Sequence, residues 1–481
     1  MQRVSRRDVL QAAAASGVCL VAGGASAQTR VVMNDASKLN PTPTFRHWTP
    51  KSQPDLIETL RRELAEAAAA GRPVVIGAAR HSMGGQSLAR HGLAITFDAG
   101  RIEPDLKAET CRVPAGARWS DVIRALDPIG YGPAVMQTNA DFGVASTFSV
   151  NAHGWPVPRG PFGSTVRSLR LMLASGDVVE CSREKNAELF SLAMGGYGLV
   201  GIILDLEIEM TKNVLLTGKL EAVAPSDFGS RFVEAILGDK GVRMAYGRLS
   251  VARNAFFREG LLATWRPAPN QPEKLPPAAS ATSLGWLSRR IYRAQIGSEA
   301  SKKARWLAET SLGPKLIAAP VTRNSLMNEP VANLGGSEGG RTDILHEYFL
   351  APGRLTDFIG LCREIIPPAR AEFLNVTFRY VAADETSTLA YAPQARIAAV
   401  MSFSQDISPE GEVDMIKMTE RLIDAAISLG GAFYLPYRLH ARPDQLAAAY
   451  PKAAQFAARK RTYDPRLLFR HALWDVYFRD L

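Results

Sequence analysis

The pattern of apolar and polar residues before position 212 predicts a helix and several short strands. A helix is expected over 55–70, because leucines recur there at helical spacing and Gly71 follows the last turn. Short apolar runs bounded by turn residues indicate the strands. We expect these strands at 73–77, 93–97, 169–173, 178–180 and 201–210. This part of the chain is therefore predicted to be an α+β unit.

A second α+β unit is predicted beyond residue 211, where the frequent glycines of the first part disappear. A proline-rich segment, 267–277, interrupts this second part before apolar runs of strand length resume in alternation with helical patterns. Strands are expected at 343–350, 375–381 and 397–404, and helices at 354–366 and 414–429.

Residues 1–27 have the pattern of an export signal and are left out of the fold prediction. Ser5-Arg6-Arg7 precedes a mildly apolar stretch that ends in Ala25-Ser26-Ala27, which is typical of a twin-arginine signal peptide. We therefore predict a periplasmic or secreted protein whose mature chain begins at Gln28. The alternative is a basic terminus without a targeting role. No later stretch is long and apolar enough to predict a membrane span.

Composition narrows the class of protein further. With 481 residues, of which 46% are hydrophobic and 22% charged, the chain is too apolar for a disordered protein and too long for a small disulfide scaffold. Cys19 lies in the predicted signal, and Cys111, Cys181 and Cys362 are far apart without nearby histidines. Neither a disulfide framework nor a metal site is expected. The net charge of +10 permits an anionic partner but does not require one.

The loop from Gly77 to Gln86 is the first candidate for chemistry. It consists largely of small residues and directly follows a predicted strand, so its backbone N–H groups are accessible to a pyrophosphate. It contains neither the glycine pattern of nicotinamide-binding proteins nor a P-loop lysine, which counts against both classes. Three further segments strengthen this signal when they are added to the loop, at 149–154, 177–190 and 195–203.

Together, in this order and spacing, the four segments resemble the PCMH-type FAD-binding domain of the vanillyl-alcohol oxidase superfamily. The similarity is greatest to its sugar-lactone and alditol oxidase and cytokinin dehydrogenase branches, and it resumes at Tyr450-Pro451 and 463–469. It implies an α+β fold in which a two-part FAD domain, 41–212 and 431–481, encloses an α+β substrate-binding (cap) domain at 213–430.

The resemblance also implies which residues contact FAD. Arg80-His81-Ser82 is similar to the loop in which several relatives attach FAD covalently through histidine, so a single covalent link through His81 is predicted. The alternative is a histidine that contacts the cofactor without a bond. The predicted FAD contacts are Gly77, Ala78, Ala79, Arg80, His81, Ser82, Gln86, Gly143, Ser146, Ser149, Asn151, His153, Gly154, Gly198, Gly201 and Ile203.

The predicted catalytic residues are Arg379, Tyr437 and His440. The strand around Arg379 resembles one that bears a Glu-x-Arg pair in sugar-lactone and alditol oxidases, although Thr377 stands in place of the glutamate. His440 falls where those enzymes carry a lysine, and either it or Tyr437 is a candidate base.

Three other positions bear on the reaction. The position that aligns with the catalytic aspartate of cytokinin dehydrogenases is Asn139, with Asp141 two residues later. Ala145 stands where glycine admits oxygen in relatives, which hints at a dehydrogenase. Glu347-Tyr348 resembles a Glu-Tyr element of the same enzymes, with a buried structural pair as the alternative.

These residues predict an enzyme that oxidises a CH–OH group of a sugar, polyol, lactone or related alcohol by hydride transfer to flavin N5. Oxygen or another electron acceptor would then reoxidise the flavin. The alternatives are an amine dehydrogenase resembling the cytokinin enzymes and a flavin- or ligand-binding module without catalysis.

The aromatic and basic stretch 286–306 suits a peripheral membrane contact, with a solvated helix as the alternative, and no nucleic-acid partner is expected.

Overall fold

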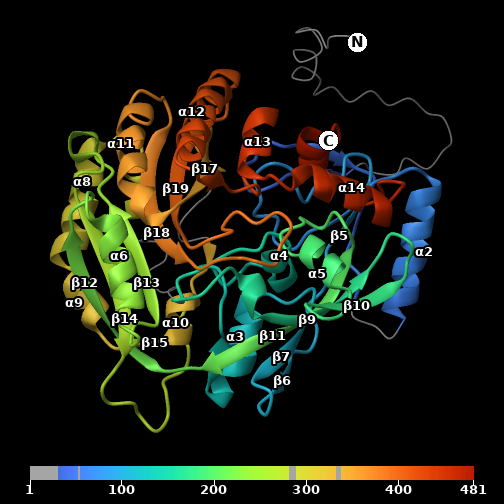
Figure 1. Ribbon diagram of the computed structural model, residues 1–481, viewed down its shortest axis with the longest axis horizontal. Helices are drawn as coiled ribbons and strands as arrows, with labels where there is room; N and C mark the ends of the chain where they lie inside the picture. The colour runs from blue at the N-terminus through green and yellow to red at the C-terminus, as the bar shows by residue number, and fades with distance from the viewer. Residues whose placement is uncertain (1–30, 52–54, 281–288, 332–336) are drawn as a thin grey trace. The chain divides into compact units, whose positions relative to one another are not determined.

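The computed structural model describes residues 31–51, 55–280, 289–331 and 337–481. The predicted signal peptide, residues 1–27, lies outside the described residues. Within the described chain, mixed helices and sheets confirm the α+β class (Figure 1).

A small parallel sheet opens the fold. Its spatial order is β3 (Arg46–Trp48), β5 (Leu93–Ile95) and β4 (Val74–Ile76). Helix α2 (Leu56–Ala69) buries Leu60 and Leu64 against the apolar residues of β4 and β5. The leucine spacing therefore predicted this helix. A separate hairpin joins β1 (Val31–Met33) to β2 (Thr42–Thr44).

A six-stranded sheet follows, and every strand pair in it is antiparallel. Its strands in spatial order are β10 (Val178–Ser182), β9 (Val166–Met172), β11 (Ile202–Lys212), β7 (Thr110–Pro114) and β6 (Glu103–Asp105), with β8 (Tyr131–Pro133) paired to the end of β11. The helices of this part are α3 (Trp119–Leu126), α4 (Val144–Ser149) and α5 (Ala187–Ala193).

A nine-stranded antiparallel sheet forms the second half of the fold (Figure 1). Its order is β15 (Val321–Thr322), β12 (Leu215–Val223), β14 (Gly260–Pro267), β13 (Met244–Leu249), β18 (Glu372–Val381), β19 (Arg396–Asp406), β17 (Arg341–Leu350) and β16 (Ser337–Glu338), with β20 (Ala432–Phe433) also on β17. The predicted strands β17, β18 and β19 form its centre. The strands β12, β13 and β14 were not predicted.

Alternation along these strands separates two faces of the nine-stranded sheet. Helices α6 (Phe228–Leu237), α11 (Leu355–Ile365) and α12 (Pro409–Ser428) cover one face. Tyr348 and Phe378 point toward this helical layer, where their rings meet those of Phe358 and Phe228 at 5.5 and 5.2 Å. Because side chains alternate, the neighbouring residues Glu347 and Arg379 lie on the opposite face. This is the face that meets the functional site.

The C-terminal segment packs back against the small parallel sheet. The N–H of Val74 donates to the carbonyl of Leu468 at 2.7 Å. The fully buried carboxylate of Asp464 fixes this turn, because it accepts hydrogen bonds from the N–H groups of Leu468 and Phe469 at 2.8 Å each. Helices α13 (Pro443–Ala449) and α14 (Ala453–Tyr463) complete the segment.

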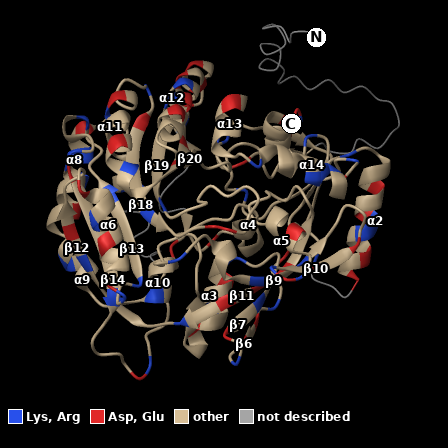
Figure 2. Cartoon of the chain, viewed as in Figure 1, with Lys and Arg blue, Asp and Glu red and all other residues tan. Residues whose placement is uncertain are grey.

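The basic stretch suggested for membrane contact buries some of its cations and leaves others exposed. Residues 281–288, which include its first three positions, lie outside the described residues. Tyr292 is buried, Arg293 pairs with Asp343 at 2.7 Å, and Lys302 is buried against Glu372 at 2.7 Å. Figure 2 shows basic and acidic residues interspersed on the helices around this sheet. Arg290 and Lys303 of the same stretch are exposed. No helix among the described residues is long and apolar enough to cross a bilayer.

Candidate active site

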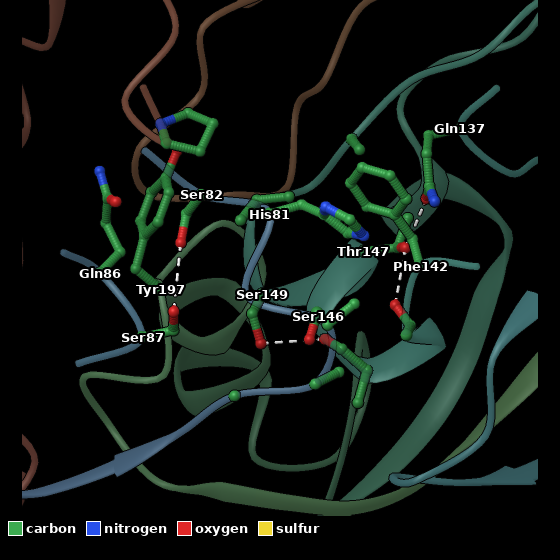
Figure 3. A pocket seen from close by; sticks show the side chains of 18 of the residues that line it. His81, Ser82, Gln86, Ser87, Gln137, Phe142, Ser146, Thr147, Ser149 and Tyr197 are labelled. Atoms are coloured by element: carbon green, nitrogen blue, oxygen red, sulfur yellow. Dashed lines mark hydrogen bonds between the residues drawn. The ribbon is translucent and has the colours of Figure 1, made fainter. Parts of the chain in front are cut away.

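A cavity lies where the loops of the first half meet the face of the nine-stranded sheet opposite the helices. Figure 3 shows side chains from the loop side of this cavity, including His81 and Phe142. Fourteen of the sixteen predicted cofactor contacts line it: Gly77, Ala78, Ala79, Arg80, His81, Ser82, Gln86, Gly143, Ser146, Ser149, His153, Gly198, Gly201 and Ile203. From the nine-stranded sheet and the segment after it come Leu345, Glu347, Arg379, Val400, Tyr434, Pro436 and Tyr437. Two of the three predicted catalytic residues, Arg379 and Tyr437, are thus in the same cavity as the loops.

The loop after β4 is tied to the C-terminal segment. Its Gln86 side chain donates to the carbonyls of Leu435 and Tyr437 at 2.9 and 3.0 Å and accepts from the N–H of Gly84 at 2.8 Å. A Cβ on Gly84 would lie only 2.5 Å from the Tyr437 carbonyl, so glycine is needed for this approach. Gln86 therefore both lines the cavity and holds its two walls together.

His81 lies at the cavity wall beside Phe142, with ring centroids 4.3 Å apart and nearly parallel planes. Its Nε2 is 3.9 Å from a carboxylate oxygen of Asp141. Burial lowers the pKa of His81, and the charge of Asp141 only partly offsets this effect. The ring is therefore neutral at physiological pH, with a nitrogen lone pair available for a bond.

Asn151 and Gly154 do not line the cavity, although both were predicted to contact the cofactor. The side chain of Asn151 is buried, donates to Asp384 at 2.8 Å and accepts from the N–H of Gly163 at 2.9 Å. A Cβ on Gly154 would collide with the Met136 carbonyl at 1.9 Å. These residues shape the turn that presents His153.

The cavity fits a flavin dinucleotide in two respects. Its loop side is lined by glycine, alanine and serine, and the loops approach so closely that a Cβ on Gly143 would lie 2.5 Å from that of Ala78. Such walls leave backbone groups accessible to phosphates. In addition, buried polar atoms of lining residues have no protein partner, as expected where a polar ligand binds: Arg80 Nε, Thr138 Oγ1, His153 Nδ1 and Arg379 Nε.

A compact polar cluster stands on the sheet side of the cavity. The carboxylate of Glu347 contacts Nε2 of His153 through one oxygen and accepts a hydrogen bond from the Tyr437 hydroxyl at 3.1 Å through the other. Glu347 and His153 are 4% and 3% exposed, so this pair is held away from bulk water. Among the described residues that line the cavity, Glu347 is the only carboxylate.

Tyr437 serves as a hydrogen-bond donor in this cluster. Burial, reinforced by the negative charge of Glu347, raises the pKa of the Tyr437 hydroxyl well above its ordinary value. The hydroxyl therefore keeps its proton near neutral pH, and the candidate proton acceptor is Glu347 instead. From the sequence, Glu347-Tyr348 was given only as a resemblance to a Glu-Tyr element, with a buried structural pair as the alternative, and no role as proton acceptor was predicted. In the structure the two side chains point to opposite faces of β17: Glu347 faces the cavity and Tyr348 faces the helices.

His440, the third predicted catalytic residue, does not line this cavity. Its ring contacts Glu412 at 2.9 Å through Nε2 and the Thr419 hydroxyl at 3.2 Å through Nδ1, both on α12. Burial would raise the pKa of Glu412, but the hydrogen bond from His440 and the charge of Arg438 together lower it to about 2. His440 thus belongs to a buried ion-pair network behind the site.

The two positions discussed for an amine-oxidising base also differ in placement. Asn139 lines the cavity and carries a neutral amide, so it cannot accept a proton as a carboxylate would. Asp141 is turned toward His81 and accepts from the N–H of Val331 at 3.1 Å. The cavity residues that were not among the predicted contacts include Ser87, Gln137, Thr138, Phe142, Thr147 and Tyr434, as well as Tyr197, which lies within the predicted segment 195–203.

Comparison with known proteins agrees with this geometry. Residues 50–182 match the family described as FAD binding domain. An uncharacterized oxidoreductase of the fasciation locus of Rhodococcoides fascians is 30% identical over 167 residues, which cover 34% of this chain and 36% of that protein. Cytokinin dehydrogenase 1 of Oryza sativa subsp. japonica is 25% identical over 468 residues, covering 87% of this chain and 84% of the relative. Cytokinin dehydrogenase 1 of Arabidopsis thaliana is 30% identical over 136 residues, covering 27% and 24%.

Proposed function

This chain belongs to the superfamily of FAD-dependent oxidoreductases with a PCMH-type FAD-binding domain, and from that premise we propose that it oxidises a CH–OH group of a small polar molecule. The observation that carries the proposal is the cluster in which Glu347, the lone cavity carboxylate among the described residues, is held by His153 and Tyr437. FAD, when bound, supplies an acceptor for a hydride from the substrate carbon.

The residues of the chain supply binding and proton transfer. Glu347 accepts the hydroxyl proton of the substrate, because its carboxylate lines the cavity and is shielded from water. His153 and Tyr437 hold that carboxylate in one orientation from both of its oxygens. Arg379 adds positive charge near the same wall, which stabilises negative charge that develops during the reaction.

Oxidation of an amine is the second candidate, and the extensive similarity to a rice cytokinin dehydrogenase supports it. Two features weigh against it. The neutral Asn139 replaces the aspartate of that mechanism, and the guanidinium of Arg379 would repel an ammonium group in the cavity.

Anaerobic mixing of the purified yellow protein with matched alcohols, lactones and amines tests the proposal. We expect alcohols to bleach the flavin absorbance and amines to leave it unchanged. Bleaching by amines alone would favour the second candidate, and resistance to every reductant of both kinds would favour a binding module. Peroxide formation on reoxidation would identify oxygen as the acceptor; its absence would agree with the alanine at position 145.

We also propose that FAD is bonded covalently to His81. Support comes from the neutral, cavity-lining imidazole that stacks on Phe142. Acid-precipitated wild-type protein should keep its yellow colour, and His81→Ala should lose it on precipitation. His91→Asn, a change at an exposed histidine, is the matched control and should behave as wild type. Loss of all colour from acid-precipitated wild type would contradict the covalent bond.

Export is the last part of the proposal and rests on the arginine pair at positions 6 and 7. The secreted or periplasmic protein should begin at Gln28, and the double change Arg6→Lys, Arg7→Lys should retain it in the cytoplasm. Normal secretion of the double variant would reject the twin-arginine route.

A further inference from the structure

Arg379 lines the cavity with an unsatisfied guanidinium. No hydrogen bond or ion pair joins it to a described residue, and its Nε is buried without a partner. A guanidinium offers five N–H donors in a planar fork and stays protonated in proteins. A guanidinium that is partly withdrawn from water and has no protein partner is costly, so the side chain is arranged for a ligand group that the protein itself does not provide.

The neighbouring carboxylate does not fill this role. Both oxygens of Glu347 already have partners, one in His153 and the other in the Tyr437 hydroxyl. The charge of Glu347 acts on Arg379 only through space, where it partly offsets the burial that lowers the pKa of the arginine. Arg379 therefore faces the cavity as a cation with free donors.

The sheet register places the two charged residues on the same face of the sheet, with strand β19 between their two strands. Glu347 lies opposite Val400, which lies opposite Thr377, and Arg379 follows two residues later on the same face of β18. With strands about 4.8 Å apart and a rise of about 3.4 Å per residue, the two backbones are roughly 12 Å apart. A molecule of a few carbon atoms can contact both side chains at once.

We propose that Arg379 binds the carboxylate of an acidic substrate, so that the alcohol oxidised at Glu347 is a hydroxy acid such as a sugar acid. This inference rests on the proposed function and specifies its substrate class. In the reaction the substrate carbon gives up a hydride, with both electrons of its C–H bond, to bound FAD. The hydroxyl proton goes to Glu347, the carboxylate is unchanged, and the product is an oxo acid.

Matched pairs of compounds that differ only in the acid group test the inference. Gluconate and glucitol compare reduction of the flavin, and butyrate and butyramide, which carry no alcohol, compare binding through the change in the flavin spectrum. We expect gluconate to reduce the flavin faster than glucitol and butyrate to bind more tightly than butyramide. A charge-assisted bidentate contact corresponds to a preference of roughly 10- to 150-fold.

Variants separate the role of Arg379 from general damage to the site. Arg379→Gln should keep its flavin and lose the preference for the acid in both measurements, while Arg379→Lys should keep part of it. Arg248→Gln is the control, because Arg248 lies on the neighbouring strand β13, pairs with Glu309 at 3.1 Å and does not line the cavity. It should keep the full preference.

The outcomes are distinct. A wild-type protein that bleaches equally with gluconate and glucitol, and binds butyrate and butyramide alike, would overturn the inference while leaving alcohol oxidation intact. Loss of flavin from Arg379→Gln would also overturn it, because the arginine would then bind the cofactor. A protein that takes up no FAD would instead refute the proposed function itself.

Discussion

The Tyr437 hydroxyl donates a hydrogen bond to Oε2 of Glu347 across 3.1 Å and thereby joins the C-terminal segment to the centre of the nine-stranded sheet. Replacing Tyr437 with Phe removes this hydrogen bond and keeps most of the packing. We expect flavin reduction to slow about tenfold, since the carboxylate loses one of the two contacts that orient it. Stopped-flow absorbance at saturating substrate measures this rate. An unchanged rate would show that His153 alone orients Glu347.

Glu347→Gln should have a larger effect. The amide retains the shape of the side chain but cannot accept the substrate proton, and general base catalysis typically contributes about 10²- to 10⁴-fold. We expect flavin reduction to slow by that factor while the protein stays yellow. Glu209→Gln, on the surface of the six-stranded sheet and paired with Arg167, is the control. If Glu347→Gln reduces its flavin at the wild-type rate, the proton acceptor is another group.

Gly143→Ala tests the close approach of the two cofactor loops. Its Cβ would lie 2.5 Å from the Cβ of Ala78, so one loop must move. We expect weaker FAD binding, measured as a lower ratio of flavin to protein absorbance after purification. Gly360→Ala on α11 adds the same atom where nothing outside the backbone of its own helix lies within 4 Å, and it should bind FAD normally. Equal flavin content in both variants would mean that this contact does not shape the site.

Local patterns predicted the parts of the fold in which neighbouring residues determine the structure. The bounds predicted from local patterns lie within a few residues of those observed for one helix, α2, and for the strands β4, β5, β17, β18 and β19. The segment from Leu215 to Pro267 was not resolved into strands. Its strands pair in the order β12, β14, β13, so their partners are set by contacts distant in sequence.

In the site, too, the features that depend on local sequence were predicted and those that depend on distant contacts were not. The small residues between Gly77 and Gln86 identified one wall of the cavity because a phosphate-binding loop has a local pattern. The opposite wall depends on which way each side chain points. Tyr437 faces the cavity, whereas His440, three residues later, turns toward α12. Aligning a sequence with its relatives gives the position of a residue but not the direction in which its side chain points. The contact between Glu347 and His153 could not be predicted locally either, because the two residues are 194 positions apart.

The network around His440 leads to a prediction about stability. Glu412 has its pKa lowered from 4.5 to about 2, so the folded state favours its charged form. A lowered carboxyl pKa stabilises the fold above about pH 4.5, and this contribution is lost as the pH falls toward 2. Glu412→Gln lacks the contribution at every pH. Its free energy of unfolding should therefore be lower than that of wild type by roughly 1–3 kcal/mol at pH 7.

The difference between Glu412→Gln and wild type should shrink below pH 4.5, because wild type then protonates the same group. Urea unfolding at pH 7, 5 and 3.5 measures it. Glu410→Gln is the control, since Glu410 lies in the same first turn of α12 and is exposed. It should unfold as wild type does at each pH. A difference that stayed constant from pH 7 to 3.5 would show that the charge of Glu412 beside His440 and Arg438 adds nothing to the stability of the fold.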